Sequence, residues 1–201
     1  LGALDTPPAE LAPSSRPALP DGEISLDGIA AVLGALLPEG AIVVDESVTS
    51  GREFFPITAG APPHDWLNNR GGSIGYGLPV ATGAAIACPD RKVIALEGDG
   101  SAMYTIQALW TMAREGLDVT VLVFANRSYK ILRGELTNVG VGNPGPRAID
   151  MLSLDRPPLD WLHMARSMGV EAARVDDLAA LARALEAGLH SEGPYLIELV
   201  M

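Results

Sequence analysis

Short apolar runs recur along this chain, and segments with helical character separate them. The runs lie at 41–44, 92–97, 118–125, 170–174 and 195–200. Run 119–124 is apolar throughout except for Thr120, which is typical of a strand covered on both faces. Strands that alternate with helices pair in parallel through right-handed crossovers. We therefore expect a doubly wound α/β fold with a mainly parallel six-stranded sheet and helices on both faces.

The expected helices fill most of the chain between these runs. They lie at 25–37, 47–57, 75–88, 103–115, 129–136, 158–168 and 176–190. The segment from Pro62 to Gly72 and the Gly- and Pro-containing segment 137–157 are expected to be loops.

The first residues differ in composition from the rest. Residues 1–22 are rich in Pro and Ala, which is typical of an extended linker, and we expect them to join a missing upstream domain. The alternative is a disordered tail on a complete protein. Residues 23–201 have the length of one domain.

Charge and cysteine content exclude some classes of function. The net charge of −11 disfavours a nucleic-acid-binding surface, which needs clustered Lys and Arg. No apolar stretch has the length of a membrane span, so we expect no membrane partner. The single cysteine, Cys88, fits a reducing compartment, and we expect a cytoplasmic location.

Polar residues follow two successive apolar runs at the point where each run ends. Gly98-Asp99-Gly100 follows run 92–97, and Asn126 follows run 118–125. Parallel strands end at the same edge of a sheet, where ligands bind in open α/β folds. Carboxylate and amide oxygens suit Mg²⁺, which takes few protein ligands beside phosphate oxygens and water. Alone, Gly98-Asp99-Gly100 also fits an ordinary turn, whereas Asn126 makes a metal site plausible.

The spacing from Gly98 to Asn126 resembles the signature of thiamine diphosphate-dependent enzymes. Three further segments, 71–79, 101–110 and 126–129, also fit the family in order and spacing. Over about residues 23–200 the chain resembles the C-terminal diphosphate-binding domain of acetolactate synthase-like and benzoylformate decarboxylase-like enzymes. One departure is Ala125, where the family usually has an asparagine.

This resemblance implies roles for individual residues. The metal ligands would be the side chains of Asp99 and Asn126 and the backbone carbonyl of Ser128. The cofactor-binding residues would be Ser47, Thr49, Gly72, Ile74, Gly100, Ser101 and Tyr129. Gly100 and Ser101 would offer backbone N–H groups to the diphosphate, as would the loop at Ser47 and Thr49. The Gly72 carbonyl would accept from the cofactor's amino group, and Ile74 would support its bent shape.

The resemblance also implies what this chain lacks. The glutamate that activates the cofactor would come from a pyrimidine-binding domain of a partner subunit, in a homodimer or tetramer. We therefore assign no catalytic residue here and expect the chain alone to be inactive.

Three functions remain open. The first is part of a thiamine diphosphate- and Mg²⁺-dependent decarboxylase or carboligase for 2-oxo acids, of the acetolactate synthase type. The second is a benzoylformate decarboxylase-like lyase, which Glu135 disfavours because it offers no obvious pocket for an aryl group. The third is a non-catalytic module that binds Mg²⁺ with a diphosphate or nucleotide.

Overall fold

A computed structural model describes residues 15–201, so most of the expected linker lies outside the described residues. The strands are β1 (Ile42–Glu46), β2 (Asp65–Asn68), β3 (Val93–Gly98), β4 (Val119–Ala125), β5 (Glu171–Val175) and β6 (Tyr195–Val200). They form one six-stranded sheet in the order β2-β1-β3-β4-β6-β5, and every neighbouring pair is parallel. The expected fold class is therefore confirmed.

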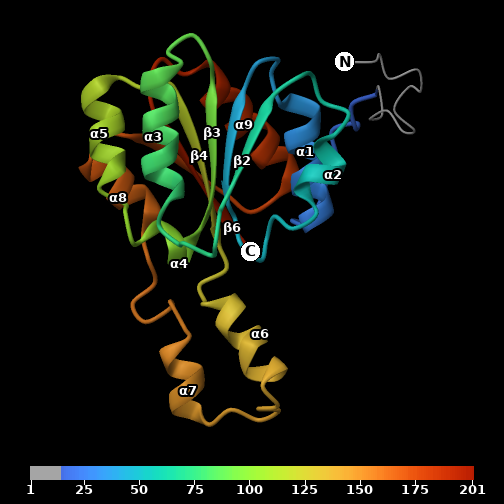
Figure 1. Cartoon of the computed structure of the whole chain (residues 1–201), viewed down its shortest axis with the longest axis vertical. Helices are drawn as coiled ribbons and strands as arrows, with labels where there is room; N and C mark the ends of the chain where they lie inside the picture. Colours follow the sequence, from blue (N-terminus) through green and yellow to red (C-terminus); the bar gives the residue numbers. More distant parts are fainter. Residues whose placement is uncertain (1–14) are drawn as a thin grey trace, which may run out of the picture.

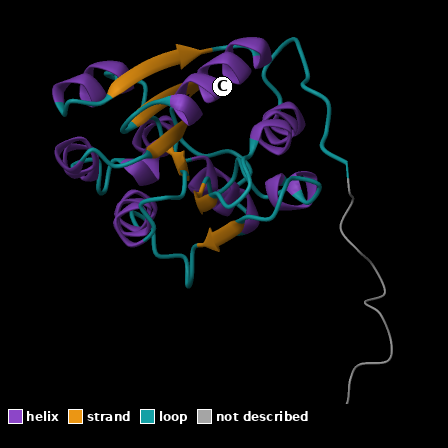
Figure 2. Ribbon diagram, turned by 90° about the horizontal axis from the view of Figure 1, so that it is seen from above, coloured by secondary structure: helices purple, strands orange, loops and turns teal. Residues whose placement is uncertain are grey.

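Helices cover both faces of the sheet (Figures 1 and 2). They are α1 (Leu26–Leu36), α2 (Phe54–Thr58), α3 (Gly77–Ala87), α4 (Asp99–Ala102), α5 (Ala108–Glu115), α6 (Lys130–Asn138), α7 (Pro146–Met151), α8 (Trp161–Ser167) and α9 (Leu178–His190). One apolar core lies between the sheet and α1, α2 and α9, and a second lies between the sheet and α3, α5 and α8. Alternate residues of the central strands supply the two cores, since successive side chains point to opposite faces.

Four expectations about local structure were wrong. Residues 65–68 form strand β2 instead of a loop, and most of its side chains are exposed at the sheet edge, so no apolar run marks it. The helix expected at 47–57 is confined to Phe54–Thr58, because the chain first turns across the end of β1. The expected loop 137–157 contains α7. The helix expected at 103–115 begins only at Ala108, preceded by the short α4.

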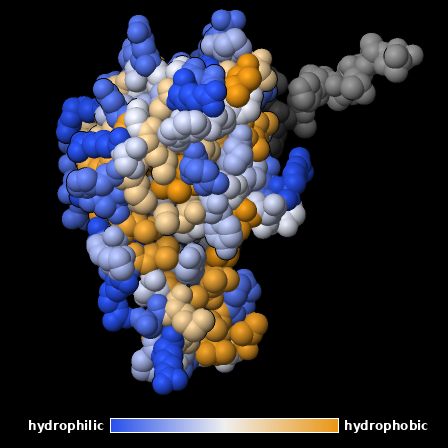
Figure 3. Space-filling view, turned by 90° about the vertical axis from the view of Figure 1, so that its left-hand side faces the viewer, coloured by the Kyte–Doolittle hydropathy of each residue, from blue (hydrophilic) through white to orange (hydrophobic). Residues whose placement is uncertain are grey.

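Helices α6 and α7 project beyond the carboxyl ends of the strands, away from the main body (Figure 1). Neither helix has a buried residue. Apolar side chains are correspondingly prominent on the lower part of the surface in Figure 3. The exposed large apolar residues between 130 and 151 are Leu132, Val139, Val141, Ile149 and Met151.

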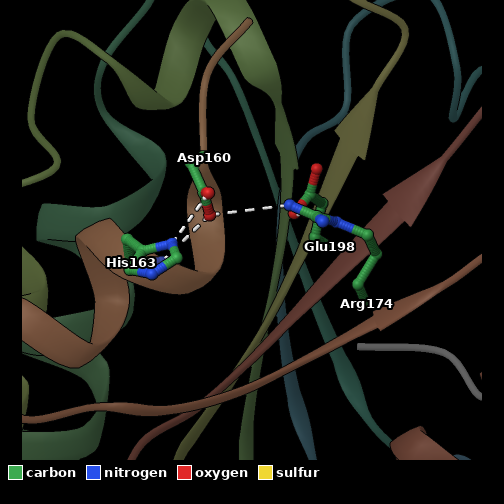
Figure 4. A network of polar contacts seen from close by, with 4 residues as sticks. All are labelled: Asp160, His163, Arg174 and Glu198. Atoms are coloured by element: carbon green, nitrogen blue, oxygen red, sulfur yellow. Dashed lines mark hydrogen bonds and ion pairs between the residues drawn. The ribbon is translucent and has the colours of Figure 1, made fainter.

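A polar network fastens the edge strand β5 to its neighbours (Figure 4). Arg174 on β5 donates through Nε to the buried carboxylate of Glu198 on β6, at 2.9 Å. Its guanidinium also lies 3.5 Å from Asp160, whose side chain accepts from the His163 N–H at the start of α8. Buried carboxylates need such partners, because an unpaired buried charge is costly.

Residues 15–22 form neither helix nor strand. Arg16 donates from its guanidinium to the carbonyls of Ala35 and Leu37, at 2.8 and 2.9 Å, and so holds this segment against the end of α1. Within residues 15–201, no helix combines the length and the apolar character that crossing a bilayer requires.

Candidate functional site

A cavity of about 380 Å³ lies at the carboxyl edge of β1, β3 and β4. Every predicted metal or cofactor residue except Gly72 lines it. Those residues are Ser47, Thr49, Ile74, Asp99, Gly100, Ser101, Asn126, Ser128 and Tyr129. Four separate segments of the chain therefore meet at one place.

The pairing of β3 with β4 brings Asp99 and Asn126 to the same edge. Gly98 at the end of β3 is in register with Phe124 on β4, and both Asp99, directly after β3, and Asn126, directly after β4, line the cavity. The Asp99 carboxylate joins the two loops directly. Its Oδ2 accepts from the Arg127 N–H at 2.6 Å, and its Oδ1 accepts from the Gly100 N–H at 2.9 Å.

Burial sets the electrostatics of Asp99. Burial raises the pKa of its carboxyl to about 6, although the hydrogen bonds from the Arg127 and Gly100 backbones act in the opposite direction. No group of three or more His, Cys, Asp or Glu residues within 15–201 could hold a metal ion. A site with one carboxylate, one amide and one backbone carbonyl instead suits Mg²⁺ bound mainly by phosphate oxygens and water.

Asn126 is oriented by the residue that is predicted to ligate beside it. Its Oδ1 accepts from the Ser128 N–H at 3.0 Å and from the Ser128 hydroxyl at 3.2 Å. Arg127, between them, has a φ of 54°. Val48, in the loop after β1, has a φ of 53° and also lines the cavity. Left-handed backbone at non-glycine residues is strained, and such strain concentrates at functional sites.

Gly100 allows the two loops to approach each other. A Cβ at this position would lie 2.7 Å from Cε1 of Tyr129 and 2.8 Å from its Cδ1. The aromatic ring of Tyr129 therefore occupies the space that any side chain at Gly100 would need. The Gly100 N–H donates to Asp99, so its predicted contact with a diphosphate stays a prediction.

The loop after β1 is shaped by Asp45, which does not itself line the cavity. Asp45 Oδ1 accepts from the backbone N–H and the hydroxyl of Ser47, and its Oδ2 accepts from Trp66 Nε1 at 3.1 Å. This bonding fixes the turn that carries Ser47 and Thr49 to the cavity wall.

Ile74 reaches the cavity from the loop that precedes α3, and 46% of it is exposed although it is a large apolar residue. Gly72, two residues earlier, is exposed with a φ of 68° and lies outside the cavity lining. The side chain of Asn69 bonds both the N–H and the carbonyl of Ser73, at 3.0 and 2.7 Å, and so closes this loop.

The cavity also has an apolar end that the sequence marked only in part. Its walls include Tyr104, Ile131, Leu132, Met151 and Leu152. Met151 and Leu152 come from the segment 137–157, which was expected to be a loop. No sequence signal pointed to them, because α7 folds back on α6 only in the tertiary structure.

Glu135 does not line this cavity. It borders a separate apolar groove of about 350 Å³ between α6 and α7, and its Oε1 accepts from Asn138 at 3.1 Å. The expectation that Glu135 disfavours an aryl substrate thus lacks support from its position. Lys130, the first residue of α6, is exposed and also lines the cavity.

Two relatives are similar to this chain over nearly its whole length. An M. tuberculosis protein with the provisional name acetolactate synthase large subunit IlvX is 54% identical over 194 residues, 96% of this chain and 38% of that protein. Benzoylformate decarboxylase of Pseudomonas aeruginosa is 35% identical over 197 residues, 98% of this chain and 35% of that enzyme. This chain thus spans little more than a third of the length of either relative.

Solved structures agree with these sequence matches. The thiamine diphosphate-dependent 4-hydroxybenzoylformate decarboxylase of Rhodococcus jostii RHA1 superposes with a TM-score of 0.76 at 29% identity, over 96% of this chain and 35% of that one. Residues 51–199 match the family model of the thiamine pyrophosphate enzyme C-terminal TPP binding domain, where thiamine pyrophosphate is another name for thiamine diphosphate. This chain therefore belongs to the thiamine diphosphate enzymes and contains their C-terminal cofactor-binding domain.

Proposed function

We propose that this chain is the cofactor-binding part of a thiamine diphosphate- and Mg²⁺-dependent decarboxylase or carboligase for 2-oxo acids, of the acetolactate synthase type. The observation that carries the proposal is the meeting of Asp99, Asn126 and Ile74 in one cavity at the carboxyl edge of the sheet. The 54% identity to the M. tuberculosis relative supports the acetolactate synthase type.

The donor set fits Mg²⁺. In this proposal, the Asp99 carboxylate, the Asn126 side-chain oxygen and the Ser128 carbonyl hold the ion, and the cofactor's diphosphate completes its shell. Ion binding would compensate the buried carboxylate of Asp99, whose pKa burial raises to about 6. The chain has a net charge of −11, so in this proposal the metal ion neutralises the diphosphate and no basic patch is required.

The remaining walls would bind and orient the cofactor. Ser47, Thr49, Gly100 and Ser101 surround the proposed diphosphate position, and Ile74 supports the organic part. When bound, thiamine diphosphate supplies the carbon nucleophile that adds to a 2-oxo acid and stores the electron pair released with CO₂. The apolar end of the cavity keeps water away from that reaction.

This chain would not perform the reaction alone. We propose that a pyrimidine-binding domain, supplied by a partner subunit of a homodimer or tetramer, contributes the activating glutamate. This chain covers 38% and 35% of the two relatives, so a protein of their length could also contain such a domain. The isolated 201-residue chain should then turn over neither pyruvate nor benzoylformate, and turnover of either would contradict this assignment.

A benzoylformate decarboxylase-like lyase is the second candidate. The apolar end formed by Ile131, Leu132 and Met151 favours it, because an aryl or bulky alkyl group would be well accommodated there. Assaying the longer protein that contains this domain against pyruvate, 2-oxobutyrate and benzoylformate would decide between the two. Aldehyde release from benzoylformate without condensation of pyruvate would favour the lyase.

Binding calorimetry distinguishes a thiamine diphosphate site from the third open function, a non-catalytic module that binds Mg²⁺ with a nucleotide. The purified chain should bind thiamine diphosphate with Mg²⁺ in preference to ADP. Asp99→Ala should weaken this binding by roughly tenfold or more, because it removes the charged metal ligand. The matched control is Asp90→Ala, in an exposed turn, which should leave binding unchanged. Preference for ADP, or unaltered binding in Asp99→Ala, would refute the assignment.

A further inference from the structure

Two glutamates lie side by side beneath the cavity without a role in the proposed binding of metal and diphosphate. Glu46 ends β1, and Glu97 is its register partner on β3. Their exposures are only 1% and 0%. Buried acidic residues are rare unless a specific interaction requires them.

Glu46 binds the backbone that enters α3. Its Oε1 accepts from the Gly75 N–H, and its Oε2 accepts from the Gly77 N–H at 2.6 Å. One carboxylate thus holds two backbone groups that lie two residues apart. Hydrogen bonds to a charged acceptor are about twice as strong as neutral ones.

Further bonds hold the same backbone segment from other directions. The Thr105 hydroxyl donates to the Gly75 carbonyl at 3.0 Å, and the Tyr76 hydroxyl donates to the Asp45 carbonyl at 2.6 Å. Gly75 has a φ of 84°, and a Cβ there would lie 2.7 Å from that of Tyr104, so only glycine fits. Segment 75–77 is therefore fixed closely, immediately after Ile74.

Glu97 lies behind this arrangement. Neither of its carboxyl oxygens has a hydrogen-bond partner that satisfies normal geometry within the described residues. Gly77 lacks a side chain where one would collide with both carboxyl groups. Burial, followed by the charge of Glu46, raises the pKa of Glu97 well above its ordinary value. Glu97 thus fills the space behind Glu46.

We propose that Glu46 is a positioning residue, which fixes the Gly75–Gly77 backbone and thereby holds Ile74 at the cavity wall, with Glu97 packed behind it. The consequence for thiamine diphosphate rests on the proposed function, whereas the fixing of the backbone does not. Glu46 would act on the organic part of the cofactor through Ile74 and leave the diphosphate contacts unaffected.

Amide hydrogen exchange in the cofactor-free chain tests the fixing of the backbone. Glu46→Gln keeps the size of the side chain but turns an NH₂ group toward one of the two N–H donors. Exchange at Gly75 and Gly77 should accelerate roughly tenfold to a hundredfold, while exchange in β4 stays unchanged. The control is Glu186→Gln, an exposed glutamate on α9, which should not affect these two amides. Unchanged exchange at both amides in Glu46→Gln would overturn the proposal.

A second measurement tests the consequence for binding. With Mg²⁺ present, Glu46→Gln should raise the Kd for thiamine diphosphate about tenfold and change that for inorganic pyrophosphate less than twofold. Equal weakening of both ligands would overturn the specific role of Ile74. If Glu46→Gln does not fold, Thr105→Val removes the bond to the Gly75 carbonyl and should give the same selective loss to a smaller extent. If the chain without any substitution bound no thiamine diphosphate, the proposed function would be refuted. The exchange rates at Gly75 and Gly77 would still decide whether Glu46 fixes the backbone.

Discussion

A methyl group added to Gly77 would enter space already occupied by two carboxyl groups. The Cβ of an alanine here would lie 2.9 Å from Oε2 of Glu46 and from Cδ of Glu97, and nearer still to Oε1 of Glu97. Both glutamates are buried, so neither carboxyl group can move into solvent. The φ of Gly77 is not positive, so Gly77→Ala isolates the steric effect from backbone strain.

Two opposing effects determine the size of the change. Replacing glycine by alanine inside a helix stabilises a protein by up to about 1 kcal/mol, and by less at Gly77, the first residue of α3. Overfilling a packed site costs about 1–3 kcal/mol. Because the obstructing atoms are buried on two adjacent strands, the steric effect should dominate, with a net loss of about 1–2 kcal/mol. For a domain of this size, that loss lowers Tm by roughly 2–8 °C.

Urea and thermal unfolding of the purified chain measure the difference. The matched control is Gly83→Ala in the same helix, where a Cβ would meet nothing within 4 Å. Gly83→Ala should raise stability by up to about 1 kcal/mol, since only the helix propensity changes. If Gly77→Ala proved as stable as Gly83→Ala, the tight packing of Glu46 and Glu97 against α3 would be refuted.

Three further predictions concern the metal site, the edge of the sheet and the loop contact. Burial raises the pKa of Asp99 to about 6, and Mg²⁺ binds the ionised carboxylate. The affinity for Mg²⁺ should therefore fall about tenfold per pH unit below pH 6 and level off above it, as measured by titration from pH 5 to 7.5. A flat profile would contradict Asp99 as a ligand. Arg174→Met should destabilise the fold by about 1.5–3 kcal/mol in urea, because Glu198 loses its charged partner; no change would show that this pair contributes nothing. Gly100→Ala should displace the ring of Tyr129 and raise the Kd for thiamine diphosphate by about tenfold in calorimetry, and unchanged binding would refute this contact as a constraint on the site.

The proximity of Asp99 and Asn126 was predictable because it depends on adjacent strands. Asp99 and Asn126 each follow a long apolar run, and these runs become β3 and β4, which pair directly. Parallel pairing alone then places both residues at one edge of the sheet. Strand β2 was not predictable in this way, since an edge strand of four residues has too few buried side chains to produce an apolar run.

The apolar end of the cavity illustrates the opposite case. Ile131 and Leu132 follow Asn126 closely along the chain, so their approach to the site could be anticipated from the sequence. Met151 reaches the same cavity only because α7 returns beside the start of α6. The intervening chain contains Gly and Pro and has no periodicity that would fix this return.

The sequence by itself determined the α/β class and predicted that Asp99 and Asn126, the candidate metal ligands, meet at one edge of the sheet. These depend on local periodicity and on the order of strands along the chain, which the residues carry directly. Only the tertiary structure decided that Glu46 and Glu97 lie side by side and that Glu46 holds the Gly75–Gly77 backbone. That arrangement arises from the register between β1 and β3 and from the approach of α3 to both, which join segments too distant in sequence for any local pattern to specify.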